Sequence, residues 1–254
     1  MSQKRAAVLV VNPSRAEAVE AASVLAALLL KADFDLFTIS DVSITGVTNC
    51  AADNLPSVEI AVVLGGDGTI LRGAELTRER NIPLLGINIG HVGFMAEVIR
   101  PEISAVAKSV IDKSYGLDSR MVLAYEVIRS GKVIDTGWAL NEVTVERQHT
   151  TMVELFVQID GRPLSRWGCD GLIASTPTGS TAYAFSAGGP VVWPSVDAML
   201  MVPLSAHALF SRPMVISPRS LLAVEVLDRS AGTGVLWCDG RRTHDLPVGA
   251  RVEV

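Results

Sequence analysis

Cysteine and aromatic residues are scarce in this sequence of 254 residues, which has three cysteines and an aromatic share of 5%. Cys50, Cys169 and Cys238 form no CxxC pair, so the sequence indicates no zinc site, redox motif or disulfide framework. This usage of cysteine favours a reduced, cytoplasmic protein.

Long apolar runs and clusters of positive charge are also missing. The best apolar run, residues 24–30, is far shorter than the roughly 20 residues that a spanning helix needs, so we expect no membrane segment. The 22 basic residues form no long run and are outnumbered by 27 acidic ones, which argues against a nucleic-acid partner. An apolar fraction of 49% argues against disorder, and the length suits one large domain or two modest ones.

Apolar runs alternate with helical patterns up to about residue 115. Strands are predicted at residues 5–11, 34–39, 60–64 and 82–89, and helices at residues 14–31, 69–80 and 101–113. Ser14 and Glu17 have the spacing of a capping box at the start of the first helix. The alternation predicts a parallel sheet covered by helices, a Rossmann-like α/β fold.

The helical signal fades after residue 118. Residues 121–135 predict a hairpin around Ser130-Gly131, and Asp160-Gly161 is a second turn signal. Further strand-like stretches lie at residues 140–146, 152–159, 221–227, 235–238 and 250–254. We therefore expect an α/β N-terminal domain over residues 1–117 and a mainly β C-terminal domain over residues 118–254.

The sharpest local feature is a glycine-rich turn after an apolar strand, Gly65-Gly66-Asp67-Gly68-Thr69. Glycines let a ligand approach the main chain, and the N–H groups at a helix start favour an anion such as phosphate. The turn is neither a Walker A loop nor a GxGxxG fingerprint. In a structural interpretation Asp67 caps the following helix, whereas in a functional one it has a metal or acid–base role. A second glycine cluster, residues 86–93, precedes Phe94.

Hydroxyl side chains are concentrated between Ser175 and Thr181, and Tyr183 and Ser186 follow them. Hydroxyls suit ribose and phosphate groups, and a tyrosine can stack on a purine; the alternative is a polar loop between strands. Asn141-Glu142 interrupts an apolar stretch and is either a nucleoside-binding pair or an ordinary strand end. The histidines show no ligand spacing, so we interpret them as structural or surface residues.

Taken together, these segments resemble NAD kinases of the bacterial type over nearly the whole chain. The matching motifs are GGDGT at residues 65–69, NxGxxGF at 88–94, NE at 141–142, DG at 170–171, TPTGSTAY at 176–183 and a late DG element within Cys238-Asp239-Gly240. GGDGT is shared with lipid kinases, whereas TPTGSTAY is far more specific. The resemblance implies an α/β first domain and a β-rich second domain with the active site between them.

The implied reaction transfers the γ-phosphoryl of ATP, or a phosphoryl of inorganic polyphosphate, to the 2′-hydroxyl of the adenosine ribose of NAD, which gives NADP. Asp67 is the expected general base, because a ribose hydroxyl is a poor nucleophile until a carboxylate accepts its proton. Backbone N–H groups of Gly66, Gly68 and Thr69 are expected on phosphate oxygens, with Arg72 paired to a phosphate. By resemblance the remaining nucleotide contacts are Phe94, Asn141, Glu142, Asp170, Thr178, Thr181, Ala182, Tyr183, Ala184, Phe185 and Ser186.

The resemblance also carries expectations about cofactor and assembly. Mg²⁺ is expected on the donor phosphates, held by phosphates and water with no dedicated protein ligands. A homodimer or homotetramer is expected. Family members usually continue with a C-terminal segment that returns to the first domain, and this sequence shows none after Val254.

Two other functions compete with this interpretation. A GGDGT-type lipid kinase would share the turn, but Asn141-Glu142 and the absence of a basic amphipathic helix argue against it. A non-catalytic NAD(P)-binding module would share the nucleotide contacts, but it has no need for a carboxylate such as Asp67 beside phosphates.

Overall fold

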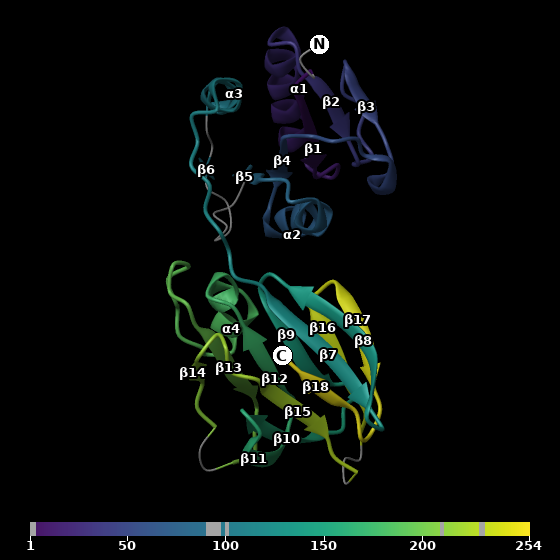
Figure 1. Cartoon of the computed structure of the whole chain (residues 1–254), viewed down its shortest axis with the longest axis vertical. Helices are drawn as coiled ribbons and strands as arrows, with labels where there is room; N and C mark the ends of the chain where they lie inside the picture. The colour runs from purple at the N-terminus through teal and green to yellow at the C-terminus, as the bar shows by residue number, and fades with distance from the viewer. Residues whose placement is uncertain (1–3, 90–97, 100–101, 209–210, 229–231) are drawn as a thin grey trace. The chain divides into compact units, whose positions relative to one another are not determined.

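The computed structural model describes residues 4–89, 98–99, 102–208, 211–228 and 232–254. The chain divides into two compact units, Met1–Asp118 and Ser119–Val254 (Figure 1). The first unit is α/β and the second is almost entirely β, which confirms the predicted fold class.

The first unit is built on a parallel sheet in the order β3-β2-β1-β4-β5-β6. The strands are β1 (Ala6–Val11), β2 (Asp35–Thr38), β3 (Val47–Asn49), β4 (Ile60–Gly65), β5 (Leu84–Asn88) and β6 (Val98–Ile99). The central strands β1 and β4 are almost wholly buried, which is why they read as continuous apolar runs. The strand order reverses between β1 and β4, so the loops that follow these two strands flank a topological switch point.

Helices cover both faces of this sheet. On one face Ala7, Leu9 and Val11 share a core with α1 (Ala16–Lys31) and α3 (Ile103–Asp112). On the other face Val8 and Val10 share a core with α2 (Asp67–Thr77). Alternate side chains of one strand thus supply two cores, which gives a three-layer α/β/α unit.

The predicted capping box of the first helix is wrong. The helix begins at Ala16 with Arg15 as its N-cap, and no side chain caps it. The N–H of Ser14 instead donates to Oδ1 of Asn12 at 3.0 Å. The asparagine side chain therefore organises the turn between β1 and α1 in place of the serine.

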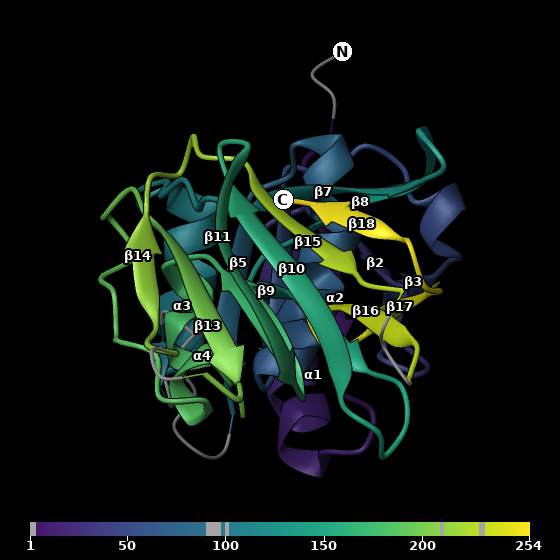
Figure 2. The ribbon, with the colours of Figure 1, turned by 90° about the horizontal axis from the view of Figure 1, so that it is seen from below.

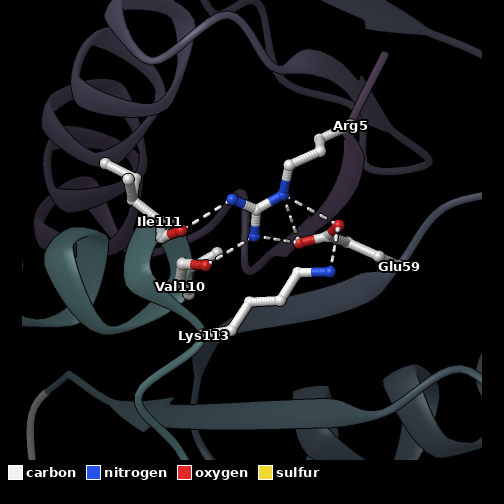
Figure 3. Close-up of polar contacts among 5 residues, drawn as sticks. All are labelled: Arg5, Glu59, Val110, Ile111 and Lys113. Atoms are coloured by element: carbon white, nitrogen blue, oxygen red, sulfur yellow. Dashed lines mark hydrogen bonds and ion pairs between the residues drawn. The ribbon is translucent and has the colours of Figure 1, made fainter. Parts of the chain in front are cut away.

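Arg5 joins three elements at the amino-terminal edge of this sheet (Figure 3). Its guanidinium pairs with Glu59 at 2.5 Å and donates to the carbonyl oxygens of Val110 and Ile111 at 2.8 and 2.6 Å. These carbonyls belong to the last turn of α3, where a cation is favoured by the helix dipole. The contact ties α3 to the starts of β1 and β4.

The second unit is a sandwich of two antiparallel sheets, in the orders β11-β10-β15-β18-β7-β8 and β14-β13-β12-β9-β16-β17. Figure 2 shows β10, β15 and β18 of the first sheet side by side. The first sheet contains β7 (Leu123–Arg129), β8 (Lys132–Ala139), β10 (Val153–Ile159), β11 (Arg162–Cys169), β15 (Leu222–Val226) and β18 (Arg251–Glu253). The second contains β9 (Glu142–Arg147), β12 (Gly171–Ser175), β13 (Met199–Leu204), β14 (Met214–Ile216), β16 (Gly234–Cys238) and β17 (Arg242–Leu246). Their inward side chains form one core, with Leu155, Leu172 and Leu236 fully or almost fully buried in it.

Two-residue turns fix the register of two hairpins in this sandwich. Ser130-Gly131 joins β7 to β8, and Asp160-Gly161 joins β10 to β11, with positive φ at all four residues. Both hairpins turn where the sequence predicts, because glycine tolerates this left-handed backbone and pairs well with a short polar residue.

In the described part of the chain, no helix is both long enough and apolar enough to span a membrane.

Candidate functional site

The glycine-rich turn lies at the switch point of the first unit. Strand β4 ends at Gly65, Gly66 is the N-cap of α2, and the helix begins at Asp67. A Cβ on Gly65 would lie 2.4 Å from Oγ1 of Thr69, so only glycine lets the strand turn this tightly into the helix. The close packing of Gly65 against the Thr69 side chain therefore requires a glycine here, whether or not a ligand binds.

The open amide groups of this turn belong to Gly66 and Gly68. The N–H of Thr69 donates to the carbonyl oxygen of Gly66 at 2.8 Å, so it is occupied in this structure. Among the described residues no acceptor is recorded for the N–H of Gly66 or Gly68. The space where a Cβ of Gly68 would lie is empty to 4 Å. Two N–H groups at a helix start are thus accessible to an anion.

Asp67 does not cap the helix, which removes the structural interpretation of this aspartate. Gly66 holds the N-cap position, and no side-chain hydrogen bond caps α2. The Oδ1 atom of Asp67 is buried and has no hydrogen-bond partner among the described residues. A buried carboxylate oxygen without a donor is costly, so its place in the turn suits a proton donor supplied by a ligand.

Two arginines bring positive charge to this edge of the sheet. Arg72 is exposed, and its Nη2 lies 3.4 Å from the carbonyl oxygen of Ile39, which follows β2. Arg15 donates from Nη1 to the carbonyl oxygen of Ile89 at 2.8 Å, and its Nη2 would lie 3.7 Å from a Cβ on Gly66. Sequence reasoning missed Arg15, because only the fold brings the loop after β1 beside the loop after β4.

Phe94 and the second half of the second glycine cluster lie outside the described residues. Among the site residues predicted in the first unit, Phe94 is therefore the one whose position the structure does not describe.

In the second unit, Asn141 and Glu142 lie where β8 gives way to β9. Glu142 is the first residue of β9 and pairs in register with Ser175 at the end of β12. The carbonyl oxygen of Asn141 accepts hydrogen bonds from the N–H of Thr176 at 2.8 Å and from Oγ of Ser175 at 3.1 Å. The two motifs, 34 or more residues apart in sequence, are thus neighbours in the fold.

Gly179 shows how closely these motifs pack. A Cβ there would lie 2.1 Å from the carbonyl oxygen of Asn141 and 2.6 Å from its Cα. No side chain fits in that space, so the glycine is required for the turn after β12 to rest on the Asn141 backbone.

The hydroxyl-rich segment divides into structural and accessible side chains. Ser175, Thr176 and Ser180 are fully buried and bonded within the protein; for example, Oγ of Ser180 donates to the carbonyl oxygen of Pro177 at 2.7 Å. Thr178 and Thr181 are half-buried. The polar-loop interpretation therefore holds for the first three side chains, while the two threonines remain accessible.

The short helix α4 (Tyr183–Ser186) presents different side chains to different surroundings. Tyr183, Phe185 and Ser186 are exposed, and Ala182 before them is half-buried. Ala184 is fully buried in a small core with Ile173, Leu200 and Val202. Only its backbone is therefore placed to contact a nucleotide.

Glu142 is a buried carboxyl whose proton affinity is altered by its surroundings. Only 6% of the residue is exposed, and Oε2 has no partner among the described residues. Burial, and then the charge of Asp239, raise the pKa of Glu142 to about 7, while a hydrogen bond from the backbone N–H of Tyr183 partly opposes the shift. A donor group from a ligand would satisfy the free oxygen and favour the charged form.

Asp170 and Tyr183 line a pocket of about 390 Å³. Nε of Arg147 pairs with Oδ1 of Asp170 at 2.8 Å on its wall. The other lining residues are Glu146, His149, Thr150, Leu204 and Ser205. Sequence reasoning missed Glu146 and Arg147 and interpreted His149 as structural or surface. The available signal was the continuation of β9 beyond Asn141-Glu142, since inward and outward side chains alternate along a strand.

No group of three or more histidine, cysteine or carboxylate side chains suited to a metal ion occurs in the described ranges.

A parallel sheet with open N–H groups in the turn at its switch point, together with a sandwich that carries a polar pocket, is typical of nucleotide-binding proteins. The chain belongs to the NAD kinase family. Residues 44–115 match the family model of the ATP-NAD kinase N-terminal domain, and residues 140–254 match that of the C-terminal domain.

Similar proteins with curated names support this membership. NAD kinase 2 of Streptomyces coelicolor is 47% identical over 259 residues, which cover 98% of this chain and 86% of that protein. The NAD kinase of Thermobifida fusca is 53% identical over 213 residues, covering 82% of this chain and 65% of that protein. The alignments with several relatives thus span about two thirds of the relative's length.

Solved structures show the same fold. A yeast NADH kinase complexed with NADH has a TM-score of 0.87 at 25% identity, covering 99% of this chain and 80% of that one. An NAD kinase from Archaeoglobus fulgidus in complex with ATP has a TM-score of 0.69 at 26% identity, covering 99% and 89%. The family membership supports an enzyme that acts as an NAD kinase, and it supports neither the lipid kinase nor the non-catalytic module.

Proposed function

We propose that this chain transfers the γ-phosphoryl of ATP to the 2′-hydroxyl of the adenosine ribose of NAD, with Asp67 as general base. The observation that carries the proposal is the buried Oδ1 of Asp67, which lacks a partner among the described residues beside two open backbone N–H groups. As the ribose oxygen forms its bond to the γ-phosphorus, the hydroxyl proton passes to Asp67. The bond from the γ-phosphorus to the bridging oxygen breaks, and ADP leaves.

Phosphoryl transfer depends on positioning and on neutralising charge. The N–H groups of Gly66 and Gly68 bind phosphate oxygens in this proposal. Arg72 and Arg15 add positive charge at the same edge of the sheet. Inorganic polyphosphate presents the same chain of phosphoryl groups, so it is the second donor we propose.

A divalent cation such as Mg²⁺ would be held on the donor phosphates beside this turn, with no dedicated protein ligand. When bound, the cation supplies charge neutralisation on the donor phosphates. The donor phosphates and water would supply its oxygen ligands.

The acceptor NAD is held by the second unit in this proposal. The free Oε2 of Glu142, together with Asn141, receives donor groups of the adenosine. Tyr183 and Asp170 bind along the pocket that they line. Thr178, Thr181, Ala182, Phe185 and Ser186 contribute from the turn and α4, Ala184 contributes through its backbone, and Phe94 is proposed to cover a ring.

The test is an assay of NADP formation from NAD, Mg²⁺ and either ATP or polyphosphate, with Asp67→Asn beside the wild type. We expect kcat to fall by about 100-fold or more in Asp67→Asn, because asparagine cannot accept the proton, while NAD binding changes little. Asp53→Asn, an exposed aspartate of the same unit, is the matched control and should leave kcat unchanged.

Equal kcat in wild type and Asp67→Asn would remove Asp67 as the base. A folded wild type that makes no NADP with either donor would refute the activity itself.

We further propose a cytoplasmic homo-oligomer. The three cysteines are free, as is usual in a reducing compartment. Large apolar side chains are exposed at Phe185, Val191 and Trp193, and such a concentration is typical of a protein interface. Light scattering on the purified protein would measure the assembly directly.

A further inference from the structure

Asp239 belongs to the late Cys238-Asp239-Gly240 element that the sequence singles out, and the proposed reaction gives it no part. It lies in the turn between β16 and β17, with φ of 53°. Its side chain is only 2% exposed. A carboxylate this deeply buried needs several donors, and the donors it has are informative.

The donors to Asp239 are mainly backbone N–H groups of the nucleotide-binding pair. The N–H of Asn141 donates to Oδ1 at 2.7 Å, and the N–H of Leu140 donates to Oδ2 at 3.0 Å. The N–H of Glu142 lies 3.4 Å from Oδ1, and the N–H of Asp239 donates back to the carbonyl oxygen of Glu142 at 3.0 Å. Arg242 completes the set with an ion pair at 3.0 Å to Oδ2.

The opposite edge of the same peptide segment is also held. Its carbonyl oxygens accept hydrogen bonds from Oγ1 of Thr176, at Leu140, and from the N–H of Thr176, at Asn141. The segment is therefore bonded through its N–H groups on one side and its carbonyl groups on the other. The carboxylate of Asp239 thus holds three successive backbone N–H groups of this segment.

We propose that Asp239 is a positioning residue for NAD binding, which fixes the backbone of residues 140–142 so that the side chains of Asn141 and Glu142 meet the adenosine. This inference rests on the proposed function, because it concerns the same acceptor site. Asp239 acts through these neighbours, without touching the reacting atoms.

The variant that tests this role is Asp239→Asn. Asparagine tolerates the positive φ of this position and keeps one acceptor oxygen, so the turn is preserved. It loses the charge and places an NH₂ group against backbone donors. We expect the dissociation constant for NAD and the KM for NAD to rise by about tenfold or more, with kcat within about threefold of wild type.

Asp160→Asn is the matched control. Asp160 also begins an Asp-Gly turn with positive φ, and its Oδ1 accepts the N–H of Leu221 at 2.9 Å. Its carboxylate bonds to Ser220 and Leu221, at the other sheet of the sandwich from residues 140–142. We expect NAD binding by this variant to match the wild type, and thermal unfolding of both variants reports any general loss of stability.

A pH profile measures the electrostatic coupling between Asp239 and Glu142. The groups that face Glu142 are Asp239, Glu146 and the backbone N–H of Tyr183, and the first two raise its pKa. Removing the charge of Asp239 therefore moves the midpoint of pH-dependent NAD binding to lower pH in Asp239→Asn. This midpoint reports the charge that Asp239 places beside Glu142, whereas a rise in KM for NAD with kcat kept reports the positioning role.

Arg242→Gln is a second variant, in case Asp239→Asn does not fold. It loosens the carboxylate of Asp239 while keeping all the backbone donors, so it should raise KM for NAD by a smaller factor.

The outcomes separate this inference from the proposed function. A wild type that makes no NADP refutes the function. An active wild type beside an Asp239→Asn variant with unchanged NAD affinity and pH midpoint refutes the inference, as does an equal loss of affinity in Asp160→Asn.

Discussion

Among the single residues of the proposed acceptor site, Glu142 is a carboxyl whose pKa is strongly raised by its surroundings. Its pKa of about 7 lies above the usual value of 4.5, so the folded protein binds a proton here that the unfolded chain releases. The stability contributed by this proton is full below about pH 4.5 and is lost as the pH rises through about 7. Hydrogen-bond donors of NAD would favour the charged carboxylate of Glu142, and so oppose the preference of the folded protein for the protonated form.

We therefore predict that NAD binds more tightly as the pH rises through about 7 and releases protons when it binds below that pH. Calorimetry without a phosphoryl donor, in buffers of different ionisation enthalpy, measures the release. Glu142→Gln should remove the pH step, whereas Glu126→Gln, an exposed strand residue, should keep it. A pH-independent affinity in the wild type would contradict this account.

The residue scale also shows where sequence reasoning succeeded and failed. Hydroxyl content alone did not separate the buried Ser175 and Ser180 from the accessible Thr178, because that division depends on which neighbours the turn acquires on folding. Arg15 was missed for the same reason, since its partner Ile89 is 74 residues away. Asp67 could be singled out, because a carboxylate between glycines conflicts with an anion-binding turn.

Among the elements, the last turn of α3 is joined to the amino edge of the first sheet chiefly through Arg5. Arg5 supplies charge-assisted hydrogen bonds to Glu59 and to two carbonyl groups of the last turn of α3, and it lies 4.4 Å from the ring centroid of Phe34. Hydrogen bonds to a charged group contribute more than neutral ones. Arg5 is 30% exposed, so solvent weakens the ion pair only in part.

We predict that Arg5→Met lowers the free energy of unfolding by about 1–3 kcal/mol at neutral pH, because two carbonyls and Glu59 lose their donor. Arg5 lowers the pKa of Glu59, so the pair stabilises the fold above the ordinary pKa of 4.5, and this contribution is lost as the pH falls through the folded value. The difference between wild type and variant should therefore narrow in acid. Denaturant unfolding at several pH values measures it.

Lys108→Met is the control for this prediction. Lys108 makes an exposed ion pair with Asp112 one turn along the same helix, and such pairs contribute little. An unfolding midpoint that falls as far in Lys108→Met as in Arg5→Met would show that any loss of charge on this unit has the same effect.

The elements that the sequence predicted are mostly central ones. Continuous apolar runs predict strands β1 and β4, and the Ser130-Gly131 turn predicts the β7–β8 hairpin. Strands β3, β6, β11, β14 and β17 went unpredicted at sheet edges, and β12 and β13 went unpredicted in the interior of the second sandwich sheet. The edge strands β3, β11, β14 and β17 are largely exposed or half-buried, so no continuous apolar run marks them. Strands β12 and β13 are buried on both faces, so they lack the alternation of a half-buried strand.

At the scale of the whole molecule, the two units differ in strand direction and in how their layers pack. The first depends on parallel strands with helices on both faces, and the second on two packed antiparallel sheets with a core of its own. The change of pattern near residue 118 is visible in the sequence, because helical periodicity stops there. The strand order within each sandwich sheet was not predictable, since it depends on pairings such as β9 with β16 that bridge about 90 residues.

Because the second unit has its own core and carries every proposed adenosine contact except Asp67 and Phe94, we predict that residues 119–254 fold alone, bind NAD and make no NADP. The fragment lacks Asp67, the proposed catalytic base, so we expect it to bind NAD without converting it to NADP. Circular dichroism would report a cooperative unfolding transition, and calorimetry would report NAD binding that weakens in the Glu142→Gln fragment. A folded fragment that fails to bind NAD, while the intact chain binds it, would mean that residues of the first unit supply essential contacts to the acceptor.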